Sequence, residues 1–272
     1  MKQQSYKSLF ELEKWYLDLV SENGDVFIFY QAKLRWRSVY LYYKSKILLS
    51  QTGEQKVATR FLNVKMPQQK NEIIEWSDSW LQLNGSWHAL QSSIHAQIVQ
   101  SNEGGLQWNC HQPSSFVELT IEGKQYKGLG YAEQLFLTML PWHISMDSLR
   151  WGRYVTKDDS IVWIELRGKE QKSFAWYNGQ QVQSVDVSEN RVLLPSLKLS
   201  LEFNDTKIIR SHKSIANAVK RIAKYIPGFT RLVPLKFLMA DETKWLSKGL
   251  LIKDTNLISK GWVIHELVTF NN

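Results

Sequence analysis

Tight-turn dipeptides divide the sequence into short apolar runs, and this punctuation limits the fold more than any other feature. Asn-Gly occurs at 23–24, 84–85 and 178–179, each time between two apolar runs. Asn and Gly accept the positive φ angles of a type I′ turn, which makes the pair the strongest short signal for a β-hairpin. The sequence therefore predicts an all-β fold of antiparallel barrels or sandwiches. Weaker turn signals lie at 122–123, 167–168 and 204–205.

One segment departs from the strand pattern and predicts an amphipathic helix near residues 211–226. Ile215, Val219, Ile222 and other apolar residues recur there at helical spacing, and Pro227-Gly228 follows. The apolar stripe has the width of a core-facing helix, so we expect this helix to cover one end of a barrel. Because the helix is also basic, peripheral contact with an anionic membrane is the alternative.

The chain divides into two halves that resemble each other weakly. GYAEQL at 130–135 resembles VIHELV at 263–268, and KLRWRSVYLYYKS at 33–45 resembles SLRWGRYVTKDDS at 148–160. Pro141 interrupts strand pairing between the halves. We therefore predict two tandem β-barrels, an N-terminal one over 1–143 and a C-terminal one over 144–272.

Composition limits the function classes. The 272 residues are 43% hydrophobic and include a single cysteine, Cys110, so an intramolecular disulfide is excluded. The net charge of +8 is scattered, and no zinc-finger, RNP or helix-turn-helix pattern occurs, so we expect no nucleic-acid partner. Neither a secretory leader nor an apolar run long enough to span a membrane is found, and we expect a soluble, cytoplasmic protein.

A glutamate lies within an apolar row of the predicted strand at 128–142. Alternate residues of a strand share a face, so Glu133 lies beside Tyr131, Leu135 and Leu137. An ionised carboxylate in such a row is costly, so Glu133 has a partner, stays protonated, or the strand assignment is wrong. Glu266 lies in a similar row near the C-terminus, where we expect an ion pair with an arginine of a neighbouring strand.

The sequence offers little support for other catalytic mechanisms. The six histidines lack metal-ligand spacing, and a single cysteine cannot form a zinc pattern. Phosphate-binding glycine motifs and nucleophile elbows are also absent. We therefore expect no metal and no cofactor, which leaves acid–base chemistry by carboxyl and phenol groups, or ligand binding alone.

Five segments of the chain resemble the lipocalin-like two-barrel superfamily, which includes carotenoid 1,2-hydratase, tocopherol cyclase and related Diels-Alderase-type cyclases. These segments are WYLDLVSENGDVFIFY, GLGYAEQL, LRWGRY, IVWIELRG and GWVIHELV. The resemblance covers nearly the whole chain. The family's E-W-W-Y block corresponds to residues 13–16, with Lys14 in place of the first tryptophan. Its Y-x-D-H-x-W-G block corresponds to Tyr131 and Glu133, with Glu for Asp, Gln134 for His, and no W-G ending.

The resemblance implies acid-catalysed hydration or cyclisation of a small apolar polyene, isoprenoid or polyketide-like molecule without a cofactor. Protonation of an alkene carbon needs a neutral acid, and aromatic rings stabilise the resulting cation. Glu133 is the predicted acid and Tyr131 its assistant. A pericyclic reaction, with Tyr131 polarising a carbonyl, is equally open. The predicted ligand-binding residues are Trp15, Tyr16, Trp36, Arg150, Trp151, Arg153 and Trp163, although each tryptophan is also a plausible core residue.

Two other functions stay open at this point. A non-catalytic carrier of hydrophobic ligands would use the same cavity, and an interaction module would use the basic helix at a membrane or a partner. The substrate and the oligomeric state are not determined by the sequence.

Overall fold

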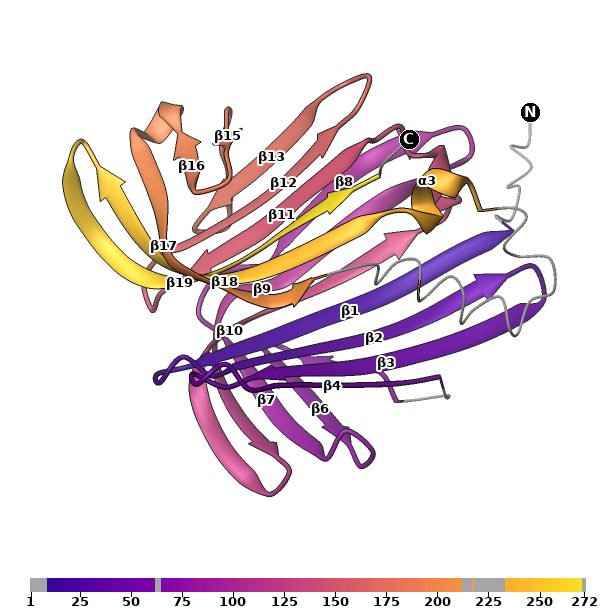
Figure 1. Ribbon diagram of the computed structural model, residues 1–272, viewed down its shortest axis with the longest axis horizontal. Coiled ribbons are helices and arrows are strands. Elements are labelled where there is room, and N and C mark those ends of the chain that lie inside the picture. Colours follow the sequence, from indigo (N-terminus) through magenta and orange to yellow (C-terminus); the bar gives the residue numbers. More distant parts are fainter. Residues whose placement is uncertain (1–8, 62–64, 212–216, 218–232, 271–272) are drawn as a thin grey trace.

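The protein folds into two curled antiparallel sheets that lie one above the other (Figure 1). The structure is a computed structural model that describes residues 9–61, 65–211, 217 and 233–270. The first sheet uses strands between residues 10 and 137, and the second uses strands between residues 148 and 269. The predicted all-β class is confirmed. The boundary predicted at residue 143 lies in the connection between the sheets, which contains a 3₁₀ turn at Pro141–His143.

The first sheet has ten strands. Along the sheet their order is β4-β3-β2-β1-β10-β9-β7-β6-β5, and β8 pairs with β9. The strands are β1 (Phe10–Ser21), β2 (Val26–Trp36), β3 (Val39–Leu49), β4 (Gln55–Arg60), β5 (Gln68–Lys70), β6 (Ile73–Asp78), β7 (Leu83–Ala89), β8 (Ile94–Ser101), β9 (Gly104–Ile121) and β10 (Lys124–Leu137).

The second sheet has nine strands in the order β14-β13-β12-β11-β19-β18-β17-β16-β15. A 3₁₀ turn at Pro195–Leu197 separates β16 from β17. The strands are β11 (Ser148–Val155), β12 (Ser160–Arg167), β13 (Lys172–Tyr177), β14 (Gln180–Gln181), β15 (Asp186–Val187), β16 (Arg191–Leu194), β17 (Leu199–Ser211), β18 (Asp241–Lys253) and β19 (Asn256–Thr269).

The two sheets share one topology, in which the first strand of each half pairs with the last. β1 pairs with β10, and β11 pairs with β19. The similar segments 130–135 and 263–268 lie in β10 and β19, so they occupy equivalent places. The other similarity is misleading, because 33–45 covers β2 and β3 while 148–160 begins in β11, the counterpart of β1.

Most of the predicted hairpin turns are present, and two are not. Turns occur at 23–24, 122–123 and 178–179, and the connection between β12 and β13 begins at Gly168, directly after Arg167. Asn84 and Gly85 instead lie inside β7, and the turn between β6 and β7 comes earlier, where Gln82 has φ 52°. A Cβ at Gly85 would lie 2.8 Å from the ring of Trp87, so this glycine makes room for an indole. Residues 204–205 form an irregularity within β17 rather than a turn.

The helix predicted near 211–226 lies outside the described residues, except for Ser211, which ends β17, and the single residue Asn217, which is helical and exposed. A single turn of helix, α3 (Leu235–Leu238), begins after Pro234 and buries Phe237. None of the helices in the described part of the chain has the length and apolar character needed to cross a membrane.

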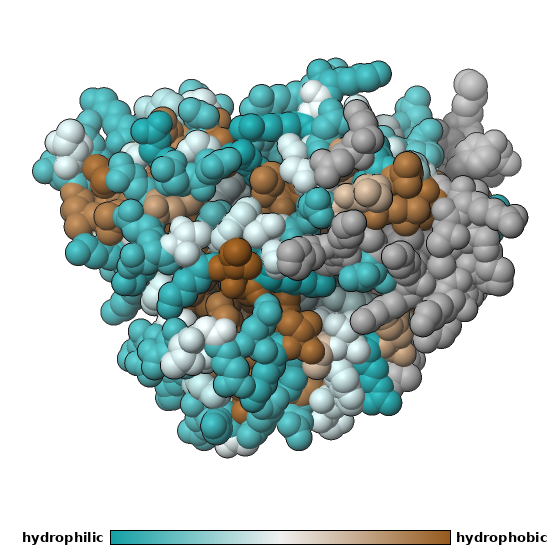
Figure 2. All heavy atoms as spheres, viewed as in Figure 1, coloured by the Kyte–Doolittle hydropathy of each residue, from teal (hydrophilic) through white to brown (hydrophobic). Residues whose placement is uncertain are grey.

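Three apolar clusters hold the fold together. One is formed by the first sheet alone and includes Trp76 and Trp87. A second is formed by the second sheet alone and includes Trp163 and Phe203. The largest takes side chains from both sheets and fills the space between them. On the face shown in Figure 2, hydrophilic side chains cover most of the surface, and hydrophobic side chains show between the two sheets.

A buried ion pair also joins the sheets. Arg153 of β11 donates to both carboxylate oxygens of Asp18 in β1, from Nη2 at 2.6 Å and from Nε at 3.1 Å. Both side chains are 0% exposed. The hydroxyl of Tyr16 donates to the same carboxylate at 2.8 Å, and Arg153 Nη1 donates to the carbonyl of Trp262. This network fixes how β11 lies on β1.

Candidate functional site

Glu133 lies on the face of β10 that looks toward the second sheet. It pairs with Tyr16 of β1 and with Cys110 of β9. The pairing of β10 with β9 shifts register twice, between Gly130 and Ala132 and again before Glu133. Such irregularities redirect side chains and are common beside functional sites. The strand assignment from sequence is therefore confirmed, together with the apolar surroundings of the carboxyl.

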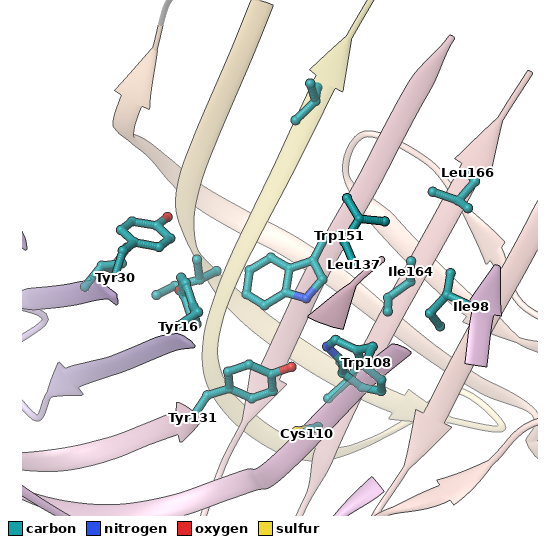
Figure 3. Close-up of a cluster of buried hydrophobic side chains, with 14 of the residues drawn as sticks. Tyr16, Tyr30, Ile98, Trp108, Cys110, Tyr131, Leu137, Trp151, Ile164 and Leu166 are labelled. Carbon is teal, nitrogen blue, oxygen red and sulfur yellow. The ribbon is translucent and has the colours of Figure 1, made fainter. Parts of the chain in front are cut away.

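Three neutral donors converge on one oxygen of this carboxyl. Glu133 Oε2 accepts from Trp108 Nε1 at 2.5 Å, from the Tyr131 hydroxyl at 2.7 Å and from Trp151 Nε1 at 3.2 Å. Figure 3 shows the phenol of Tyr131 and the two indoles pointing toward one another, from β10, β9 and β11. The second sheet thus supplies part of the site.

The other oxygen of Glu133 is open. Oε1 accepts no hydrogen bond from the described part of the chain, and it is not among the fully buried atoms that lack a partner. The side chain as a whole is only partly exposed. Among the described residues, Oε1 is thus left without a hydrogen-bond donor, while Oε2 is bound by three.

Burial raises the pKa of Glu133 above its usual value. The hydrogen bonds from Trp108 and Tyr131, and the charges of Lys14 and Lys244, act in the opposite direction without cancelling it. No guanidinium of the described residues forms an ion pair with Glu133. Of the three alternatives that the sequence left open, the structure excludes a wrong strand assignment, and it gives the carboxyl both hydrogen-bond partners and a raised pKa.

Aromatic rings surround the carboxyl. Ring centroids are 5.9 Å apart for Tyr16 and Tyr131, 5.1 Å for Tyr16 and Trp151, and 5.7 Å for Tyr131 and Trp151, all edge to face. Trp108 packs on Trp176 of β13 with centroids 4.7 Å apart. Faces of this kind stabilise a positive charge by about 0.5 to 2 kcal/mol each.

An inter-sheet cavity of about 420 Å³ lies beside these rings. Tyr30, whose ring is 5.3 Å from that of Tyr16, belongs to its wall. The wall is mainly apolar and includes Phe10, Leu34, Trp142, Val233, Phe237 and Phe270. Its polar members are Lys14, Tyr30, Tyr43, Arg210, Glu242 and Glu266. This size and lining are typical of small-molecule sites.

The partner of Glu266 is a lysine, not the predicted arginine. Lys244 of β18 forms an ion pair with Glu266 of β19. Its ammonium group also lies over the rings of Trp151, at 4.8 Å, and Tyr16, at 5.3 Å. Although burial opposes ionisation, the charges of Lys244 and Lys14 lower the pKa of Glu266.

Glu242 has the opposite behaviour in the same wall. Burial, followed by repulsion from Glu266, raises the pKa of Glu242 to about 7. At pH values just below 7, Glu242 is therefore protonated while Glu266 is ionised.

Replacing Glu242 with glutamine tests this arrangement. A carboxyl whose pKa is 4.5 when unfolded and about 7 when folded stabilises the protein below pH 4.5, and this contribution is lost as the pH rises through about 7. We expect the free energy of unfolding of wild type to fall by about 1 to 3 kcal/mol between pH 5 and pH 8 because of this carboxyl. In Glu242→Gln this part of the decrease should be absent. Urea titrations at the two pH values measure the difference. An equal pH dependence in both proteins would contradict the assignment.

The structure brings only some of the predicted site residues together. Tyr16, Tyr131, Glu133 and Trp151 meet between the sheets. Trp36 also faces this space, 6.4 Å from the ring of Trp142, but it is not part of the described cavity wall.

The remaining predicted residues lie elsewhere. Trp15 packs inside the first sheet, stacked on His111 at 4.8 Å, and Trp163 packs inside the second. Arg153 forms a buried ion pair with Asp18. Its guanidinium therefore has a structural role, and not the ligand contact that the sequence predicts. Arg150 lies against a separate pocket within the second sheet.

Several residues of the site were missed from sequence. They are Trp108, Tyr30, Arg210, Glu242 and Lys244. A signal existed for two of them, since Glu242, Lys244 and Leu246 alternate along one strand and all three are buried. Nothing in the local pattern marks Trp108, because its contact with Glu133 depends on the register of β9 on β10.

Comparisons with known proteins agree with this architecture. No protein-family model and no curated protein sequence matches the chain. Among solved structures it is similar to an AttH candidate from Nitrosomonas europaea (TM-score 0.57, 10% identity, 97% of this chain and 93% of that chain). It is also similar to kievitone hydratase from Nectria haematococca (0.55, 10%, 97% and 90%) and to CghA (0.53, 11%, 96% and 88%). The chain thus has the lipocalin-like two-barrel fold of these proteins.

Proposed function

We propose that this protein is a cofactor-free hydratase or cyclase that acts on a small apolar molecule with a reactive carbon–carbon double bond. The observation that carries the proposal is the Glu133 carboxyl, with one oxygen held by three donors and the other open. The similarity in fold to kievitone hydratase supports it. An isoprenoid, a polyene or a polyketide-like compound is the substrate class that suits the apolar cavity wall.

In the proposed reaction, Glu133 gives its proton from Oε1 to one carbon of the alkene. The π bond breaks, a C–H bond forms, and the other carbon becomes cationic. Trp108, Tyr131 and Trp151 then stabilise the carboxylate through Oε2, and they need not move to do so. Water, or a hydroxyl of the substrate, adds to the cation and returns a proton to Glu133. Water gives hydration, and an internal hydroxyl gives cyclisation.

The aromatic rings and the two lysines have different tasks in this scheme. The faces of Tyr16 and Trp151 lie within reach of a cation formed beside Glu133. The ammonium group of Lys244 already lies over both rings, and its charge is neutralised by Glu266. This pairing limits the repulsion that the ammonium group would exert on a substrate cation.

A carrier function is the second candidate, and one observation favours it. The wall of the inter-sheet cavity includes Glu242 and Glu266 but not Glu133, so a ligand could lie there without contacting the acid. A carrier would bind apolar ligands with micromolar or better affinity and release them unchanged.

Incubation in D₂O separates the two functions. A panel of prenylated phenols, linear isoprenoid alkenes and polyene acids is incubated with the protein and analysed by mass spectrometry. The enzyme proposal expects a hydrated or cyclised product with deuterium in a new C–H bond, because the proton of Glu133 exchanges with solvent. Ligands that co-purify with the protein and remain unlabelled would establish the carrier. Failure of every compound to bind would overturn both functions.

A further inference from the structure

We propose that the second sheet contains a separate binding site for a small aromatic or aliphatic carboxylate, in which Arg150 binds the carboxylate group. A pocket of about 310 Å³ lies within this half, and it shares only Glu266 with the wall of the inter-sheet cavity. Trp163, Phe203, Trp245 and His265 are among its lining residues, and Arg150 is its cation. The proposal does not depend on the reaction suggested for Glu133.

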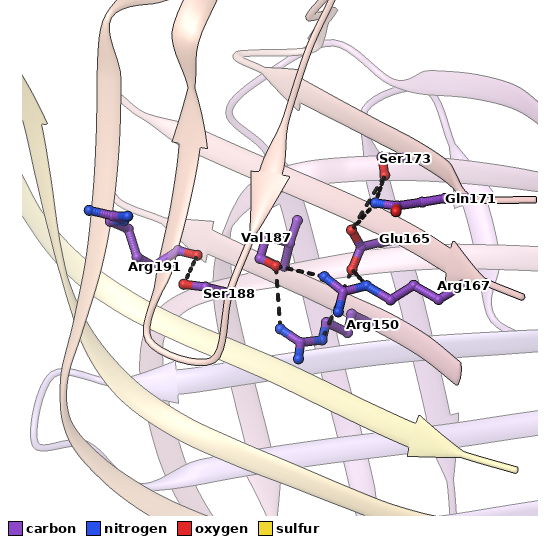
Figure 4. Close-up of polar contacts among 8 residues, drawn as sticks. All are labelled: Arg150, Glu165, Arg167, Gln171, Ser173, Val187, Ser188 and Arg191. Atoms are coloured by element: carbon purple, nitrogen blue, oxygen red, sulfur yellow. Dashed lines mark hydrogen bonds and ion pairs between the residues drawn. The ribbon is translucent and has the colours of Figure 1, made fainter. Parts of the chain in front are cut away.

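Arg150, whose side chain is 15% exposed, has few hydrogen-bond partners. Its Nε is fully buried without a hydrogen bond, and its Nη1 reaches the carbonyl of Val187 only at 3.4 Å. Arg167 Nη2 donates to the same carbonyl at 3.1 Å. Figure 4 shows the two guanidinium groups converging on this one acceptor.

The nearby carboxylate does not satisfy Arg150. Glu165 Oε2 is 4.0 Å from Arg150 Nε but 2.7 Å from Arg167 Nε. Gln171 Nε2 donates to the other oxygen of Glu165 at 2.9 Å. Two arginines thus lie near one carboxylate, and Arg167 is the closer of the two. A partly buried guanidinium with an unpaired Nε is costly, and an anionic ligand would reduce that cost.

The charges around the pocket are compatible with an anionic ligand. Glu266 faces it but is neutralised by Lys244. Burial, with the charges of Lys244 and Arg150, lowers the pKa of His265 to about 4, so its imidazole is neutral at physiological pH. Glu189 lies at the exposed rim, where water screens its charge. Arg150 is therefore the charge that a buried ligand group meets.

The walls suit a flat apolar body. Trp163 stacks on Phe203 with ring centroids 5.8 Å apart, and Trp245 stacks on His265 at 5.1 Å. The rim consists of the exposed residues Ser188, Glu189 and Thr206. A planar ring can enter from this rim and place its carboxylate at Arg150, in the bidentate geometry that guanidinium groups favour.

Binding of 1-naphthoate, measured by calorimetry beside its neutral analogue 1-naphthalenemethanol, tests the proposal. We expect 1-naphthoate to bind wild type at least about tenfold more tightly than the alcohol, the contribution of a charge-assisted pair. Arg150→Gln should remove this preference. Arg191→Gln, which changes an exposed arginine of the same sheet, is the matched control and should preserve it.

A second variant guards against misfolding of the first. Ser188→Trp changes an exposed rim residue and should weaken 1-naphthoate by about tenfold or more by closing the entrance, with an unchanged melting temperature. If 1-naphthoate binding instead survives both variants and is lost in Tyr30→Phe or Glu242→Gln, the ligand occupies the inter-sheet cavity and the second site is wrong. Absence of binding to wild type at millimolar concentration would also overturn it. None of these results bears on the D₂O assay.

Discussion

Replacement of Arg153 by methionine should lower the free energy of unfolding by about 3 to 5 kcal/mol, the usual effect of removing one partner from a buried ion pair. Arg153 and Asp18 are both 0% exposed, so the substitution leaves the Asp18 carboxylate in a dry core. Among the described side chains, only the hydroxyl of Tyr16 would still donate to it. Because the pair joins β11 to β1, the loss should affect the packing of both sheets. Urea unfolding followed by tryptophan fluorescence measures the change.

A surface ion pair provides the matched control. Arg35 donates to Glu11 at 2.7 Å, but Glu11 is half-exposed, and pairs of this kind contribute about 0 to 1 kcal/mol. Arg35→Met should therefore be nearly neutral. The double variant Asp18→Asn, Arg153→Met should recover much of the stability, since it removes the uncompensated charge. Equal effects of the Arg35 and Arg153 substitutions would show that the buried pair does not hold the sheets together.

The hairpin signals were sufficient to predict the fold class, but not every turn. At 178–179 the two residues have φ values of 49° and 79°, as a type I′ turn requires. At 84–85 the same dipeptide lies within a strand, because the glycine is needed beneath the ring of Trp87. The dipeptide is the same in the two cases, and the tertiary packing of a tryptophan distinguishes them.

Alternation along a strand located Glu133 and Tyr131 correctly, because both lie in one strand and share one face. It could not identify which tryptophans approach them. Trp15 neighbours Tyr16 in sequence but points to the opposite face, while Trp108 and Trp151 come from strands on either side of the space between the sheets. Contacts between sheets depend on how the sheets are stacked, and no periodicity within one strand encodes that.

Glu133→Gln should reduce turnover by about 10² to 10⁴-fold, the range for loss of a general acid. Glutamine keeps a carbonyl oxygen for the three donors, so we expect the fold and ligand affinity to persist. Glu133→Asp keeps an acidic proton on a shorter side chain and should retain more activity than Glu133→Gln. Glu118→Gln, at an exposed pair with Lys127, is the control and should behave as wild type. The kcat of each variant in the D₂O assay measures the effect.

The proposed reaction requires that the Glu133 carboxyl, whose pKa burial raises, be protonated at neutral pH between the two sheets. Infrared difference spectroscopy of wild type against Glu133→Gln tests it without a substrate. We expect wild type at pH 7 to show the carbonyl stretch of a protonated carboxyl, shifted in D₂O and absent from the variant. A difference spectrum that contains only carboxylate bands would contradict the account, because an ionised Glu133 has no proton to give.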